Sequence, residues 1–410
     1  MARSYPPTIA LFGIFGADNF GNDGSLVAML NHLRATCEGV RVSAICTYPH
    51  IVEARHGVPA IPIREALEYR RSSSFAMRLL HRVFVRLPWD VRAWVRCVLY
   101  MREVNLLVIP GTGILDDYAV SPGDLPYGLF RWCVAARLAG AKVLFVSVGA
   151  GPITHPTSRW LMRAAARLAD YRSFRDQISK DFMTSLGLDT RRDRVYPDLT
   201  FSLPPPTPRL HVGVSREPSV IGVGVMAFYG WANDPVRGEV TFSLYVNKIA
   251  DFVVWLLGCG YSVRLILGER GDAVAADFII RRAKSLVGCI EGKLIWSAQT
   301  SVEAVLAEIS LSDMLVATRF HNLVWGVLLD KPMISLGYLP RHAALMRDVG
   351  LEKYCQQIED FELRILIEHF NEVRDDWCRL ENRVRQKRLE YQWWLQQQYD
   401  GPLSRFFCGA

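Results

Sequence analysis

The sequence lacks any regular pattern of cysteines. It contains nine cysteines, an odd number, and no two of them form a C-x-x-C pair. Zinc sites, thioredoxin-like redox motifs and disulfide frameworks depend on such pairs or on an even, regularly spaced set. Because most of the cysteines lie among apolar neighbours, we expect buried thiols in a reducing compartment and no metal site.

Long apolar runs are also missing. No uninterrupted apolar stretch reaches the roughly 18 residues that a transmembrane helix requires. Residues 1–8 contain one arginine, two prolines and no apolar core, which is not the pattern of a secretory signal. We therefore expect a cytoplasmic protein. Peripheral attachment to the inner face of the membrane is the alternative that the sequence leaves open.

The motifs that bind nucleotides and nucleic acids are absent as well. The glycine-rich loop near the N-terminus matches neither G-x-G-x-x-G nor the P-loop pattern, so a dinucleotide or a nucleoside triphosphate is not indicated. The net charge of +7 is spread along the chain without a nucleic-acid recognition signature. This mild basic excess suits an anionic substrate or an acidic membrane surface.

What the sequence does contain is a repeated alternation of apolar strands and helices. Its 410 residues are too many for one ordinary core, so we expect two domains. The first predicted strand, at residues 9–14, is apolar on both faces, as in covered parallel sheets. Further strands are predicted at residues 42–46, 106–109, 142–148, 171–174, 220–225, 262–267, 314–316 and 333–336, and within residues 289–296. The tightest loops follow strands, which is typical of doubly wound α/β domains.

A run of prolines at residues 204–208 divides this alternation into two series. We therefore predict an α/β fold of two tandem Rossmann-like domains, residues 1–208 and 209–360, whose catalytic edges face a central cleft. Residues 361–410 are predicted to form a helical, polar tail that carries spaced aromatic side chains.

One short turn in the second series combines an arginine with a histidine. Arg319 and His321 lie between an apolar strand at 314–316 and a helix at 323–329, where open α/β sheets place their ligands. Arginine binds anions through a planar fork of donors, and histidine transfers protons near neutral pH. An ordinary ion pair and a partly buried imidazole are the simpler interpretation of such a pair taken alone.

Two further stretches suggest contacts with a ligand or a surface. The loop at residues 15–25 is rich in glycine and Asx residues and opens a helix, so its backbone N–H groups suit an anion, or it is a tight turn with Asx caps. Residues 69–103 interleave eight arginines with tryptophan, leucine and valine. This pattern fits an interfacial membrane helix and fits a solvated helix face equally well.

Taken together and in order, six stretches of the chain resemble the polysaccharide pyruvyltransferase family. Five are matched by Asn19-Phe20-Gly21, Gly149-Ala150-Gly151-Pro152, Arg175-Asp176 with Ser179 and Asp198, Arg319-Phe320-His321, and Tyr338 with Arg341. The sixth, a triple-glycine turn, is represented by Gly111-Thr112-Gly113, in which the middle glycine is replaced. Asn22 stands where the family usually has an aspartate, and Asp23 follows one residue later.

This resemblance implies a GT-B-like architecture, phosphoenolpyruvate as the donor and a saccharide acceptor, lipid-linked or not. The product is a pyruvate ketal, made during exopolysaccharide or cell-surface glycan synthesis. The first domain is then the acceptor side and the second the donor side. The matched residues predicted to bind substrate are Asn19, Gly21, Gly111, Gly113, Arg175, Arg319, Tyr338 and Arg341.

The residue types suggest how the reaction proceeds. Arg319 and Arg175 hold the carboxylate and the phosphate of the donor, and His321 protonates its methylene carbon. Asp18 or Asp23 accepts the proton of the sugar hydroxyl, and neither a metal nor another cofactor is needed. His155 and His342 are expected at the surface.

Two other functions remain as alternatives at this level. One is a GT-B glycosyltransferase with a nucleotide-sugar donor, since fold does not determine function. The other is a non-catalytic scaffold that docks a saccharide-assembly complex on the membrane through residues 69–103.

Overall fold

The computed structural model describes residues 7–64, 87–118, 120–206, 218–230, 235–288 and 290–407. Most of the predicted basic stretch, residues 69–86, lies outside this part of the chain, as do residues 207 and 208 of the proline run. Contacts divide the chain into two compact units. The first unit comprises Met1–Ala17, Ser25–Leu199 and Gln396–Ala410, and the second comprises Asp18–Gly24 and Thr200–Leu395. The predicted boundaries at residues 208 and 360 and the central cleft stay predictions.

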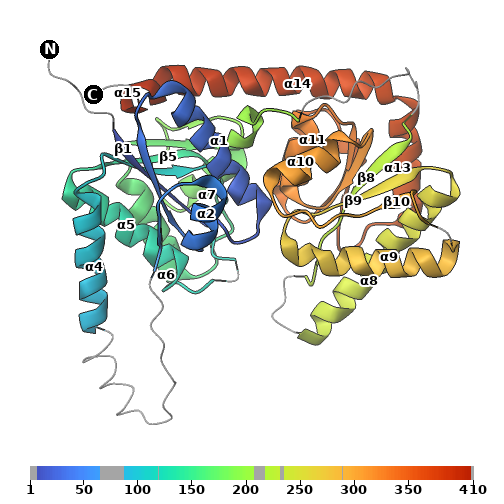
Figure 1. Ribbon diagram of the computed structural model, residues 1–410, viewed down its shortest axis with the longest axis horizontal. Helices are drawn as coiled ribbons and strands as arrows, with labels where there is room; N and C mark the ends of the chain where they lie inside the picture. Colours follow the sequence, from blue (N-terminus) through green and yellow to red (C-terminus); the bar gives the residue numbers. More distant parts are fainter. Residues whose placement is uncertain are drawn as a thin grey trace, which may run out of the picture. The chain divides into compact units, whose positions relative to one another are not determined.

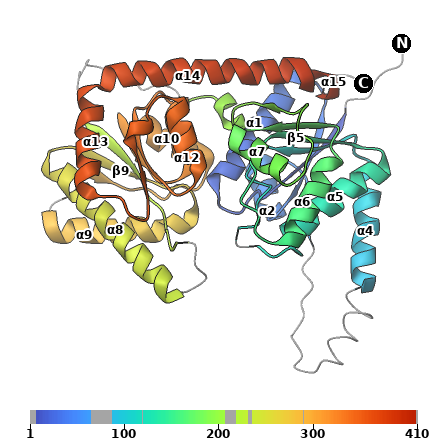
Figure 2. The same ribbon diagram turned by 180° about the vertical axis from the view of Figure 1, so that it is seen from behind.

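The first unit contains a parallel sheet with the strand order β3-β2-β1-β4-β5-β6-β7. The central strands have no polar face, and such uniformly apolar strands are stable only where helices cover both sides of the sheet (Figures 1 and 2). The strands are β1 (Thr8–Gly13), β2 (Arg41–Cys46), β3 (Ala60–Pro62), β4 (Leu106–Pro110), β5 (Lys142–Val148), β6 (Tyr171–Phe174) and β7 (Arg194–Val195).

The helices of the first unit follow the predicted alternation. They are α1 (Phe20–Thr36), α2 (Pro49–His56), α4 (Leu87–Met101), α5 (Leu125–Ala139), α6 (Pro156–Arg167) and α7 (Gln177–Ser185). Helix α2 and strand β3 were not expected from the sequence, because eight and three residues are too few to show a clear periodic pattern. The α4, α5 and α6 helices lie side by side, as both views show (Figures 1 and 2).

The second unit repeats this architecture with the strand order β10-β9-β8-β11-β12-β13, again parallel. The doubly wound α/β prediction is therefore confirmed for both units. The strands of the second unit are β8 (Val220–Gly224), β9 (Ser262–Ile266), β10 (Leu294–Ile295), β11 (Met314–Ala317), β12 (Met333–Gly337) and β13 (Cys355–Gln357). Its helices before the tail are α8 (Pro235–Gly258), α9 (Ala273–Val287), α10 (Val302–Ser310), α11 (Phe320–Leu328) and α12 (Pro340–Asp348).

Helix α8 is the longest helix of the second unit and runs from Pro235 to Gly258. Within the described residues it is the one helix, at Val236–Gly258, that is long and apolar enough to cross a membrane by length and composition alone. Its C-terminal half packs in the core of the second unit, where the rings of Phe252 and Phe370 lie 6.0 Å apart. A core helix of a globular domain has the same composition, so this feature carries no further conclusion.

The tail is helical, as predicted. It consists of α13 (Leu363–Asp375), α14 (Trp377–Gln398) and the short α15 (Ser404–Phe407). The last residues of α14 belong to the first unit, where Gln398 accepts a hydrogen bond from Ser147 Oγ at 3.0 Å and donates one to Ser173 Oγ at 2.8 Å. None of the seven cysteines that the structure describes forms a disulfide.

Candidate functional site

The turn between β11 and α11 lies at the C-terminal edge of the second sheet, as predicted. Strand β11 is fully buried and ends at Ala317, and the Thr318 hydroxyl donates to the carbonyl of Gly224 on the neighbouring strand at 3.0 Å. Arg319 then adopts the extended conformation of a helix N-cap, and His321 falls in the first turn of α11. The fold thus places both side chains at the edge where parallel sheets bind ligands.

Arg319 is held by two carboxylates. Its Nε and Nη2 atoms donate to the two oxygens of Asp272 at 2.9 and 2.6 Å, and Nη2 also lies 2.6 Å from Glu269 Oε1. Burial lowers the pKa of Arg319, but Asp272, Tyr338 and Glu269 together outweigh the effect of burial and the net shift is upward. The guanidinium is therefore a fixed positive charge, and the ion pair expected under the simpler interpretation is present.

Asp272 orients Arg319 because its own position is fixed by the backbone. Its carboxylate accepts hydrogen bonds from the N–H groups of Ala227 at 2.9 Å, Gly268 at 3.2 Å and Glu269 at 3.1 Å. The side chain is completely buried. In the sequence, Glu269 and Asp272 follow a strand end, where they could face the cleft, but a helix cap was the simpler interpretation of Asp272.

A segment from the N-terminal part of the chain joins this edge. Asn19 forms an isolated antiparallel bridge with Glu269, and its amide lies 3.3 Å from Glu269 Oε2. The Phe20 N–H donates to the carbonyl of Gly268 at 3.1 Å. Asp18 lies 3.3 Å from the guanidinium of Arg270 and has a positive φ of 58°. The loop that was predicted to bind substrate is therefore attached to the turn that positions Arg319.

The same loop contacts His321. A Cβ atom built on Gly21 would lie 2.0 Å from Nδ1 of His321, so only glycine fits at this position beside the imidazole ring. The ring of His321 also packs near those of Phe320 and Trp325, at 5.6 and 5.9 Å. The Asn19-Phe20-Gly21 and Arg319-Phe320-His321 elements, about 300 residues apart in the chain, thus meet within the second unit.

The two candidate general bases differ in exposure. Asp18 has a partly exposed side chain beside Arg270, whereas Asp23 is 3% exposed in the first turn of α1. Solvent and a sugar hydroxyl reach a partly exposed carboxylate more readily than a buried one. The role of either residue as a base stays a prediction.

Tyr338, Arg341 and His342 surround the turn from the other side. Tyr338 follows β12, and its ring lies 4.5 Å from that of His342, while the Arg341 guanidinium lies 5.9 Å from the ring of Phe320. The expectation that His342 lies at the surface is wrong. It is fully buried, with Nε2 3.1 Å from the Thr318 carbonyl and Nδ1 3.1 Å from that of Leu339.

The environment keeps His342 neutral. Burial, reinforced by the nearby Arg341 charge, lowers its pKa to about 3. A neutral imidazole donates one hydrogen bond, either to the carbonyl of Thr318, which directly precedes Arg319, or to that of Leu339. We therefore regard His342 as a residue that positions the turn. His155, by contrast, is exposed, as expected, and caps helix α6 by accepting a bond from the Thr157 N–H.

The remaining predicted site residues belong to the first unit. Arg175 pairs with Asp198 at 3.0 Å, and both side chains are at most 3% exposed. A Cβ on Gly149 would lie 2.6 Å from Arg175 Nε, and a Cβ on Gly111, whose φ is +63°, would lie 2.3 Å from Ser25 Oγ. Gly113 follows Gly111 in the same turn after β4. Because Arg175 and Arg319 belong to different units, their joint action on one donor stays a prediction.

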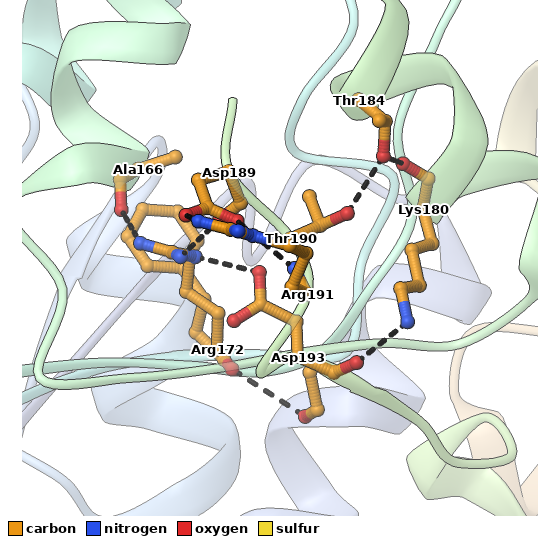
Figure 3. Close-up of polar contacts among 10 residues, drawn as sticks. Ala166, Arg172, Lys180, Thr184, Asp189, Thr190, Arg191 and Asp193 are labelled. Carbon is orange, nitrogen blue, oxygen red and sulfur yellow. Dashed lines mark hydrogen bonds and ion pairs between the residues drawn. The ribbon is translucent and has the colours of Figure 1, made fainter. Parts of the chain in front are cut away.

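A second group of arginines in the first unit serves the fold. Figure 3 shows Arg172 reaching the carboxylate of Asp193 and the backbone carbonyls of Ala166 and Asp189, at 2.9 Å in each case. Arg191 forms two bonds with Asp189. These contacts stabilise the loop before β7. Because the arginines that line the adjacent pocket serve this structural role, the pocket is not our candidate site. Among the described residues, no group of His, Cys, Asp or Glu side chains is arranged to hold a metal ion.

Comparison with known proteins identifies the fold. The chain is similar to the UDP-GlcNAc 2-epimerase of Neisseria meningitidis, with a TM-score of 0.57 and 10% identity over 92% of this chain and 94% of that chain. It is also similar to the UDP-GlcNAc 2-epimerase of Methanocaldococcus jannaschii, with a TM-score of 0.55 and 10% identity over 89% of this chain and 91% of that chain. It is equally similar to a glycosyltransferase from Rickettsia africae, with a TM-score of 0.55 and 11% identity over 99% of this chain and 100% of that chain. These likenesses confirm a GT-B-like fold, and at such low identity they show the fold alone.

Sequence comparison is more specific. No curated protein sequence matches the chain. A family model described as polysaccharide pyruvyl transferase matches residues 19–340, well over half of the sequence. The matched region begins at Asn19 of the N-terminal loop and includes the Arg319–His321 turn, the two elements that meet in the second unit. The chain belongs to the polysaccharide pyruvyl transferase family.

Proposed function

We propose that this transferase moves pyruvate from phosphoenolpyruvate onto a saccharide, as a ketal that bridges two hydroxyl groups. The observation that carries the proposal is the junction of Arg319 and His321 with the Asn19–Gly21 loop, in a chain of this family. An anion-binding guanidinium next to a proton donor suits a donor that bears a carboxylate, a phosphate and a methylene to be protonated. The products belong to exopolysaccharides or cell-surface glycans.

In this proposal Arg319 binds one anionic group of the donor. Asp272 is buried and orients the guanidinium, whereas Glu269 has a side chain that is 35% exposed. The incoming carboxylate or phosphate takes the place of Glu269 at Nη2, while Asp272 keeps its two bonds. Exchange of one carboxylate for another preserves the charge balance of a partly buried site, which limits the cost of desolvation.

His321 then acts as the acid. It delivers a proton to the methylene carbon, which becomes a methyl group, and positive charge develops at C2 of the donor. One sugar hydroxyl adds to C2 and loses its proton to a base, for which Asp18 is the more accessible candidate. Phosphate leaves with its bonding electron pair, and the second hydroxyl adds to C2 and loses its proton to close the ketal.

The experiment is a donor and acceptor panel with the full chain. We expect phosphate release from phosphoenolpyruvate in the presence of one class of saccharide, together with a mass gain that corresponds to ketal-linked pyruvate. The relatives of similar fold are named for UDP-GlcNAc or as glycosyltransferases, so nucleotide sugars form the parallel arm. Transfer from a nucleotide sugar without transfer from phosphoenolpyruvate would replace this proposal by the glycosyltransferase alternative.

A further inference from the structure

Helix α4 of the first unit exposes an unbroken row of apolar side chains. Leu87, Val91, Val95 and Leu99 follow one another at four-residue intervals, and their exposed fractions are 59%, 54%, 52% and 52%. Residues four apart lie on one helix face, so these side chains form a continuous stripe. Isolated exposed apolar residues are normal on a protein surface, but a contiguous row marks an interaction site.

The stripe cannot be buried by rotation of the helix. The opposite side of α4 is fixed to α5, because Trp94 Nε1 donates to the Tyr127 hydroxyl at 2.9 Å and that hydroxyl donates to Asp90 at 2.6 Å. Cys97 and Met101 anchor the same side in the core. The stripe therefore faces away from α5 as a consequence of specific contacts.

Positive charge runs beside the stripe. Arg92 and Arg96 directly follow Val91 and Val95 in the sequence, and both are exposed. Asp90 is the one acidic residue of α4, and it lies on the side that contacts α5. An apolar row flanked by arginines is the composition of helices that lie in the interface of an anionic bilayer.

We propose that the α4 stripe, with Arg92 and Arg96, docks the protein on the surface of a membrane rich in anionic phospholipids. The apolar side chains enter the boundary between headgroups and acyl chains, and the two arginines bind lipid phosphates. Because this inference uses only residues of α4 and α5, it stands independently of the donor and acceptor chemistry proposed above.

The test uses the full chain and vesicles made of phosphatidylcholine alone or of an equimolar mixture of phosphatidylcholine and phosphatidylglycerol. We expect co-flotation with the mixed vesicles only, and release by high salt, since screening weakens the contribution of the arginines. The double variant Arg92→Gln/Arg96→Gln should lower the partition coefficient about thirtyfold. Val91→Ser/Val95→Ser should lower it comparably while the charge is unchanged.

A second exposed row in the same chain provides a matched control. Val240 and Leu244 on α8 are 55% and 60% exposed, but the neighbouring Glu239 is acidic. Val240→Ser/Leu244→Ser should therefore leave flotation unchanged. All three variants change exposed positions, so we expect them to fold like the wild type. Circular dichroism spectra and thermal midpoints that match the wild type confirm this. The proposal is overturned if the wild-type chain does not float with the mixed vesicles. It is also overturned if the α4 variants float as well as wild type, or if they convert a dimer into a monomer.

Discussion

Gly21 and His321 fit together only because Gly21 has no side chain: a Cβ at that position would lie 2.0 Å from the imidazole Nδ1. The substitution Gly21→Ala must therefore displace either the imidazole or the N-terminal loop. We expect a fall in the rate of phosphate release of about 100-fold, in the range for loss of a positioned acid, and a destabilisation of about 1–3 kcal/mol from overpacking. Gly123→Ala is the control, because a Cβ there meets nothing within 4 Å. Equal effects of both substitutions would contradict the assigned contact.

Asp272 is predicted to be the strongest stability determinant of the site. Asp272→Asn leaves the Arg319 guanidinium without its buried counter-charge and disturbs three backbone hydrogen bonds. We expect a loss of about 3–5 kcal/mol in the free energy of unfolding, measured by chemical denaturation. Asp251, which pairs with Arg282 at a half-exposed site, is the matched control, and Asp251→Asn should cost less than about 1 kcal/mol. A small effect of Asp272→Asn would remove this residue as the anchor of Arg319.

Glu269 should behave in the opposite manner. If the donor anion takes the place of Glu269 at Arg319, then Glu269→Gln removes the competing carboxylate. We expect the KM for phosphoenolpyruvate to fall about two- to fivefold, with little change in stability. This factor corresponds to the free energy of one partly exposed ion pair. Glu303→Gln, an exposed acidic position on α10, should leave KM unchanged. An increase in KM for Glu269→Gln would mean that Glu269 helps to bind the substrate.

His321 and Arg319 are predicted to affect different steps. His321→Ala removes the proposed acid but leaves the guanidinium, so phosphate release should fall about 10²–10⁴-fold while calorimetric binding of phosphoenolpyruvate is retained. Arg319→Ala should weaken donor binding itself. Phosphate release at the wild-type rate by His321→Ala would exclude this residue as the acid.

Stability should depend on pH through two histidines, His342, which is buried, and His32, which is partly buried. Burial lowers the pKa of His342 to about 3 and that of His32, stacked on Tyr399, to about 4. Since the ordinary histidine pKa is near 6.5, the unfolded chain binds more protons between those values, and stability falls as the pH drops below about 6.5. The slope should approach about 1.4 kcal/mol per pH unit for each histidine.

The matching variants are His342→Gln and His32→Gln. Each variant should lose less stability than the wild type as the pH falls from about 6 to 4.5. This range lies above the pH at which carboxylates with lowered pKa values begin to protonate. Thermal midpoints recorded across this range provide the measurement. A wild-type pH slope in both variants would show that other groups cause the acid sensitivity.

The sequence predicted those parts of the fold that depend on local pattern. The apolar run Leu106–Ile109 forms a central strand, and Arg319 and His321 lie on the expected strand-to-helix turn. The edge strands β3 and β13 were missed, because a strand of three residues is too short to carry a periodic signal. Their pairing depends on the strands already formed beside them.

The partners of the site residues could not be predicted from local pattern. Asp272 reaches Arg319 because β9 and β11 flank β8 in the sheet, and no feature of either segment specifies that order. His342 was expected at the surface because it follows Pro340 and Arg341, yet helix α12 turns it inward to the Thr318 carbonyl. Such contacts follow from tertiary packing, which overrides the polarity of the neighbouring sequence.

Residues Asp18–Gly24 belong to the second unit, and this limits how the gene can be divided into fragments. A fragment that begins at Thr200 would contain Arg319, Asp272 and His321 but would lack the Asn19–Gly21 loop that contacts Glu269 and His321. The site around Arg319 and His321 is thus encoded in two separate parts of the reading frame. Truncation or exchange of either half by recombination would therefore deliver an incomplete site.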